Sequence, residues 1–106
     1  MPTKIEITYI KNNKNKFDFT VKQNDVVFYT KVYSPKTAED QHFMGYALAQ
    51  TAQNEVNTEI ERKPDFRWNS FEEFKAWIGS PELRHRAVQY FYDNIEEWHK
   101  NPAQGW

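Results

Sequence analysis

The side chains best suited to metal binding or to general acid–base chemistry are three histidines, His42, His85 and His99. His85 and His99 are 14 residues apart within one predicted helix, which separates them by about 21 Å along its axis. One metal ion cannot join side chains that far apart, and no H-E-x-x-H or H-x-x-E-H motif is present. Cysteine is absent, which excludes thiolate ligands. The sequence therefore predicts neither a metal site nor a cofactor.

Acidic residues and glycines offer no catalytic set. The adjacent carboxylates Glu72-Glu73 and Glu96-Glu97 point about 100° apart on a helix, so the members of each pair do not share a proton. No G-x-S-x-G, P-loop or G-x-G-x-x-G motif exists, and the chain has three glycines in total. We therefore expect a protein without enzymatic activity, and no small-molecule substrate is evident. A hydrolase or nuclease built from scattered Asp, Glu and His is the weaker alternative.

Lysines and tyrosines gather in the first third of the chain. Tyr29, Lys31 and Tyr33 alternate along a predicted strand, and because Lys31 should face water, both tyrosines are expected to share its side. By the same alternation Val27 joins them, and the core side receives Val26, Phe28, Thr30 and Val32. The residues that we predict to contact a partner are Tyr29, Lys31, Tyr33, Lys14, Lys16, Lys22 and Trp106.

Two functions fit this lysine- and tyrosine-bearing surface. A sheet covered by helices on one side leaves its other side open, and the tyrosines there, with Val27 and Ile10, would form a protein-binding patch. The same side chains would also suit single-stranded nucleic acid, whose bases stack on aromatic rings. The net charge of −1 and the absence of arginine before Arg62 favour the protein partner. If the aromatic residues instead cover the edge of the core, or if the final segment of the chain folds back over the open side of the sheet, neither surface exists.

The elements that must position these residues begin with three strands. Apolar and polar residues alternate over 3–10, 17–22 and 26–33, and polar turns at 12–16 and 23–25 join these segments. Short turns between consecutive strands predict an antiparallel meander. Residues 65–68 are either irregular or a fourth strand at the edge of the sheet.

Three helices are predicted after the strands. Thr37 is the expected N-cap of a long helix that ends near Lys63, and an apolar stripe along it should lie across the sheet. Residues Ser70 and Glu73 match the capping box, in which the glutamate reaches back to the amide of the cap residue. The stripe of the long helix is formed by Met44, Leu48, Ala52, Val56 and Ile60.

The end of the second helix and the start of the third carry consecutive signals. Gly79 is expected to adopt the left-handed conformation that ends a helix, and Ser80-Pro81-Glu82 opens a helix that runs to about Lys100. Two i,i+4 ion pairs are expected on its outer side, Glu82 with Arg86 and Glu96 with Lys100. Its inward residues are predicted to be Leu83, Ala87, Val88, Phe91, Ile95 and Trp98.

The length of 106 residues predicts one α+β domain over 1–106. We expect a three-stranded, possibly four-stranded, antiparallel meander followed by one long and two shorter helices packed on one face. The aromatic content of 17% is high enough to favour a packed core over disorder. No apolar run is long enough to span a bilayer, and no secretory signal precedes the first strand, so the expected location is the cytoplasm.

Residues 65–98, DFRWNSFEEFKAWIGSPELRHRAVQYFYDNIEEW, follow the predicted meander. This stretch resembles the layout of some small phage-encoded anti-CRISPR inhibitors, in which two consecutive capped helices back a short antiparallel sheet. The resemblance rests on Asp65-Phe66, Ser70-x-x-Glu73, Trp77, Gly79 and Pro81 and covers about a third of the chain. The long helix at 37–63 departs from that layout, so no contact residues are carried over. The resemblance implies a non-enzymatic protein that blocks a bacterial defence complex by occupying a protein surface.

Overall fold

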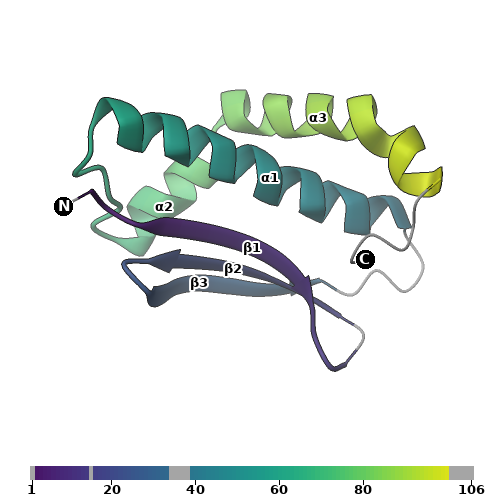
Figure 1. The fold of residues 1–106 in the computed structure, drawn as a ribbon, viewed down its shortest axis with the longest axis horizontal. Helices are drawn as coiled ribbons and strands as arrows, with labels where there is room; N and C mark the ends of the chain where they lie inside the picture. Colours follow the sequence, from purple (N-terminus) through teal and green to yellow (C-terminus); the bar gives the residue numbers. More distant parts are fainter. Residues whose placement is uncertain (1, 15, 34–38, 101–106) are drawn as a thin grey trace.

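The computed structural model describes residues 2–14, 16–33 and 39–100, and it has the predicted α+β architecture (Figure 1). The sheet consists of β1 (Ile5–Lys11), β2 (Phe17–Gln23) and β3 (Val26–Tyr33). The helices α1 (Glu39–Arg62), α2 (Phe71–Ile78) and α3 (Pro81–Lys100) follow. All three helices lie on the same side of the sheet, and α3 packs along α1 in an outer layer. The predicted N-cap, Thr37, lies outside the described residues.

The sheet is an antiparallel meander in the order β1-β2-β3. A two-residue turn joins β2 to β3, and its residues Asn24 and Asp25 have φ angles of 52° and 66°. Positive φ at both central positions matches the twist of the strands, and Asn and Asp tolerate it better than most residues. The Asn24 side chain also accepts a 3.0 Å hydrogen bond from the Lys4 amide, which ties the turn to the start of β1. Residues 65–68 are irregular, so the described sheet has three strands.

A bulge in the β2–β3 ladder changes which β3 side chains face the helices. Val21 lies opposite Tyr29 and Lys22 opposite Val27, which leaves Phe28 as an extra residue. Phe28 and Tyr29 therefore both turn toward α2, where their ring centroids lie 5.8 and 5.2 Å from that of Phe74.

The predicted faces of β3 are accordingly wrong for most of the strand. Tyr29 and Tyr33 pack against the core instead of facing solvent, and Val26, Thr30 and Val32 are exposed instead of buried. Phe28 lies on its expected inner side and Val27 on its expected outer side. Val26, opposite Gln23, is also on the helix side, although it is 68% exposed. The prediction assumed that an exposed Lys31 must lie on the open side of the sheet. Lys31 is exposed, but it shares the helix side with the two tyrosines. Helix α1 crosses β1 and β2, so the helix side of β3 is only partly covered and a lysine there still reaches water.

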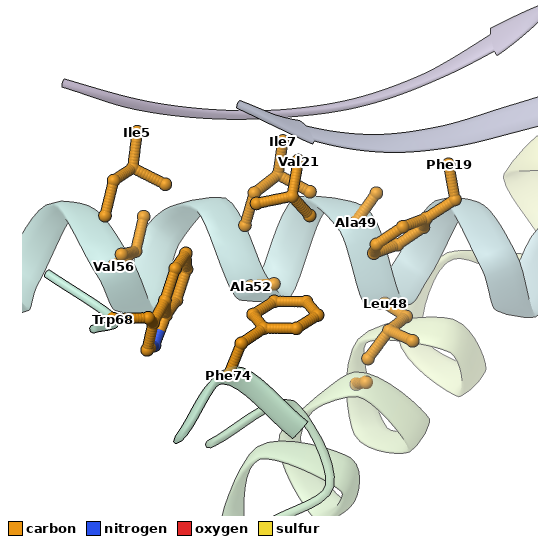
Figure 2. Close-up of a cluster of buried hydrophobic side chains, with 11 residues drawn as sticks. Ile5, Ile7, Phe19, Val21, Leu48, Ala49, Ala52, Val56, Trp68 and Phe74 are labelled. Carbon is orange, nitrogen blue, oxygen red and sulfur yellow. The ribbon is translucent and has the colours of Figure 1, made fainter. Parts of the chain in front are cut away.

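The main core lies between the sheet and α1, as the apolar stripe predicts (Figure 2). Side chains from β1 and β2 point onto α1, whose small residues Ala49 and Ala52 let the helix approach the strands closely. Trp68 and Phe74 close this core from the α2 side. The other buried members are Ile5, Ile7, Phe19, Val21, Leu48, Val56 and Ala87.

Two glutamine side chains complete the backbone hydrogen bonding at places where strands end or lack a neighbour. Gln53 of α1 accepts from the Ile7 amide at 2.6 Å and donates to the Ile5 carbonyl at 3.1 Å, so it occupies the outer edge of β1. Gln23 donates to the Trp68 carbonyl at 3.0 Å and accepts from the Trp68 amide at 2.9 Å. In the described chain, no comparable hydrogen bond reaches the outer edge of β3. Neither glutamine pairing was anticipated, because a primary amide matches backbone groups only once tertiary contacts bring them together.

The capping signals of α2 are confirmed in part. The Ser70 hydroxyl accepts from the Glu73 amide at 3.2 Å, but the Glu73 carboxylate accepts from the amide of Asn69, one residue before the cap, at 2.7 Å. Gly79 has φ −91°, so the predicted left-handed conformation is wrong. Its amide instead donates to the Lys75 carbonyl, and a Cβ would lie 3.0 Å from that oxygen, which gives a packing reason for glycine.

Helix α3 begins with the predicted Ser80 cap, whose hydroxyl accepts from the Leu83 amide at 3.2 Å. Its inner side forms a second core against α1, built from Phe43, Ala47, Phe91 and Trp98. The predicted pairs of Glu82 with Arg86 and of Glu96 with Lys100 do not form within the described chain. Arg86 instead pairs across the helix interface with Glu55 of α1 at 2.7 Å, because that carboxylate lies in reach of the packed helix.

Candidate functional site

The side of the sheet turned away from the helices carries three short rows of side chains, one residue from each strand per row. We call this surface the open face. Its middle row is threonine throughout, and the Oγ1 atoms of Thr20 and Thr30 lie 3.4 Å apart. Its exposed aliphatic side chains are Ile10, Val27 and Val32, which are 60%, 55% and 51% exposed. The rows are Glu6, Lys22 and Val27; Thr8, Thr20 and Thr30; and Ile10, Asp18 and Val32.

The charges of the open face are few and partly neutralised. Glu6 forms a 3.1 Å ion pair with Lys4, and Asp18 accepts a 3.0 Å hydrogen bond from the Asn12 side chain. The hydrogen bonds that the Lys4 ammonium donates to Glu6 and, with a smaller effect, to Asp25 raise its pKa. Two carboxylates, Glu6 and Asp18, against one ammonium, Lys22, give the face a formal charge of −1. Such a surface does not attract a polyanion.

The residues predicted to contact a partner do not form one surface. Lys22 lies on the open face, whereas Lys14 and Lys16 lie at the β1–β2 turn, where both amides donate to the Asn12 side chain. Tyr29 is half-buried, and its ring stacks on that of Phe71 with centroids 5.8 Å apart. Trp106 lies outside the described residues. The prediction that Tyr29 and Tyr33 form a base-stacking surface on the open side of the sheet is therefore wrong, because both tyrosines are on the helix side.

Lys31 and Tyr33, by contrast, meet at a pocket of about 260 Å³ where β3 lies beside α1 and α3. Its base includes Gly45, where a Cβ would lie 2.9 Å from the phenol ring of Tyr9, so only glycine leaves this space without displacing that ring. The pocket is lined by Lys31, Tyr33, Met44, Gly45, Leu48, Arg84, Ala87 and Val88.

Two cations give the pocket its electrostatic character. The Lys31 ammonium lies 5.1 Å from the centroid of the Tyr33 ring, and Arg84 approaches from α3. Burial raises the pKa of Tyr33, the neighbouring Tyr29 raises it further, and the positive charge of Arg84 opposes both effects. Among the described residues that line the pocket, none is a carboxylate. Arg84 was not among the residues predicted to contact a partner. Its position did give a signal, because it precedes the inward Ala87 by three residues and therefore lies on the same side of α3.

Metal ligands do not assemble in the part of the chain that can be described. Each histidine follows a glutamate by three residues, at Glu39, Glu82 and Glu96, a spacing that lets two side chains share one side of a helix. Among the side chains that are described, no group of three or more His, Cys, Asp or Glu could hold a metal ion. The side chains of His42 and His99 are not among them. The described helices also include none that is long and apolar enough to cross a membrane.

Comparison of the chain with protein-family models, with curated proteins and with solved structures found no match. The assignment of a function therefore depends on the open face and on the pocket.

The tyrosines beside the pocket predict a loss of stability at alkaline pH. Burial raises the pKa of Tyr9 and Tyr33, so the folded protein keeps phenol protons that the unfolded chain releases near its ordinary pKa of about 10. Because the unfolded state then binds fewer protons, the free energy of unfolding should be constant from about pH 7 to 9 and fall above about pH 10. Urea denaturation across this range measures it. Tyr33→Phe should lessen the decline, and an equal decline in both proteins would contradict the assignment to Tyr33.

Proposed function

We propose that this chain is a non-enzymatic binding protein that associates stoichiometrically with another protein through the open face of its sheet. One observation carries the proposal: Ile10, Val27 and Val32 are each more than half exposed on a surface that no described helix covers. Exposed aliphatic side chains on one face gain free energy when a partner removes them from water. The residues that contribute are now Ile10, Val27 and Val32 rather than Tyr29 and Tyr33.

The shape and charge of the open face favour a protein over a nucleic acid as the partner. Six of its nine members are β-branched (Thr8, Ile10, Thr20, Val27, Thr30 and Val32), so most of its side chains are short and stiff, and this mixture of aliphatic and hydroxyl groups suits a protein surface of mixed polarity. Its formal charge of −1 and its lack of exposed aromatic rings offer neither phosphate contacts nor a stacking surface.

The narrower expectation, a phage or mobile-element inhibitor of a bacterial defence complex, rests on the layout of residues 65–98 and stays a prediction. It is consistent with a binding protein in an intracellular setting. A defence complex offered in purified form is therefore the first partner class to test.

A double variant that introduces two positive charges tests the open face. Ile10→Lys with Val32→Lys should reduce complex formation at least about 10-fold, because two ammonium groups would have to lose water at the contact. Both side chains are exposed, so the free energy of unfolding should change by only about 0.5 kcal/mol. Size-exclusion chromatography with light scattering of the protein and its captured partner reports the stoichiometry.

The matched control is Tyr92→Lys, which places one ammonium on an equally exposed position of α3. A photo-crosslinking amino acid at Thr20 should mark the same partner, whereas one at Tyr92 should not. Complex formation that survives the double variant, or that Tyr92→Lys abolishes instead, would refute the open face as the contact surface.

A further inference from the structure

We infer that the pocket between β3, α1 and α3 binds a carboxylate attached to a short apolar body. This inference does not depend on the proposed function, because the pocket is on the helix side of the sheet and the open face is on the other side.

The cations of the pocket lack the partner that a neighbouring arginine has. Arg86, two residues after Arg84, is neutralised by Glu55 at 2.7 Å. Within the described part of the chain, neither Lys31 nor Arg84 takes part in an ion pair. Lys31 and Arg84 line one concave site, so an anion bound there would be attracted by both positive charges.

The remaining lining selects the kind of anion. Leu48, Ala87 and Val88 give one wall an aliphatic surface, which favours an apolar group next to the charge. The planar guanidinium of Arg84 can donate two parallel hydrogen bonds to a carboxylate, and the Lys31 ammonium can supply a third. A volume of about 260 Å³ is below that of most drug-sized sites, so the apolar body should be no longer than about six carbons. A free acid and the last residue of a peptide share this chemistry.

Methyl and backbone NMR titrations of the full chain with two acids and their uncharged counterparts test the inference. Hexanoate and N-acetyl-leucine should shift the signals of Leu48 and Val88, with a Kd on the order of 1 mM for the better ligand. Hexanol and N-acetyl-leucine amide, which lack the negative charge, should bind at least about 10-fold more weakly. Tighter binding of hexanoate indicates a free acid as the source, and tighter binding of N-acetyl-leucine indicates a chain terminus.

Arg84→Met should weaken binding of the better acid at least about 10-fold, and Lys31→Met should weaken it several-fold. Both residues are exposed, so both variants should keep the wild-type melting temperature. Arg86→Met is the matched control and should bind as the wild type does. The inference is overturned if neither acid shifts the Leu48 and Val88 signals at 10 mM. It is also overturned if the wild type binds the uncharged counterparts as tightly as the acids, or if Arg84→Met binds the acids as tightly as the wild type does.

Discussion

Phe74→Ala is expected to lower the free energy of unfolding by about 3–5 kcal/mol, the usual cost of removing a fully buried aromatic ring. Phe74 is 0% exposed, and its ring contacts those of Phe28, Tyr29 and Trp68 at centroid distances of 5.8, 5.2 and 4.9 Å. Removal of the ring would leave a cavity between α2 and the sheet. Urea denaturation followed by tryptophan fluorescence measures the change.

Phe71→Ala is the matched control, because Phe71 lies in the same helix and also stacks on Tyr29 but is 45% exposed. Its loss should cost about 1 kcal/mol, since less apolar surface returns to water. Equal effects of the two substitutions would mean that α2 does not hold its ring side chains in the core as the structure shows.

Gln23→Leu is expected to cost about 3 kcal/mol although it adds apolar surface. The buried Gln23 amide satisfies both the N–H and the carbonyl of Trp68, and leucine would leave these two backbone groups without partners in a site that water does not reach. Denaturation midpoints at neutral pH compare the variant with the wild type. Gln53→Leu removes an analogous pair at the partly exposed edge of β1, where water can replace it, and should cost about 1 kcal/mol.

Gln23→Glu separates the hydrogen bonds from the packing. A carboxylate can accept from the Trp68 amide but cannot donate to its carbonyl, whereas the protonated acid can do both. Burial should raise the pKa of this glutamate above its ordinary value of about 4.3, so its stabilising contribution is present below that pH and lost as pH rises. The variant should therefore approach the wild type near pH 4 and fall behind at pH 7. A constant difference across this range would show that the two hydrogen bonds do not matter.

The helices and the order of the strands could be predicted because local signals specify them. The Ser80 cap and the apolar stripe of α1 are found where the sequence places them. The turn predicted at 23–25 is shorter in the structure, because Gln23 belongs to β2 and only Asn24 and Asp25 form the turn. The inward residues of β1 and β2 also follow from simple alternation.

The faces of β3 could not be predicted because they depend on the ladder rather than on the strand. The extra residue Phe28 at the bulge shifts the alternation of side chains along β3. Because α1 lies over the first two strands, Lys31 remains exposed to solvent on the helix side of β3. The pocket was hidden for the same reason: Arg84 joins Lys31 and Tyr33 only after α3 has packed against α1. Periodicity within one element contains no information about such a meeting of three elements.

The Gln53 side chain makes the two edges of the sheet unequal as sites for the addition of another strand. A strand from another molecule could add to β3, whereas beside β1 the Ile7 amide and the Ile5 carbonyl are already hydrogen-bonded to Gln53. Two copies joined through β3 would form a six-stranded sheet whose outer strands are both β1. Gln53 hinders the addition of further strands to such a sheet, and replacing it would free the Ile7 amide and the Ile5 carbonyl for pairing with another molecule.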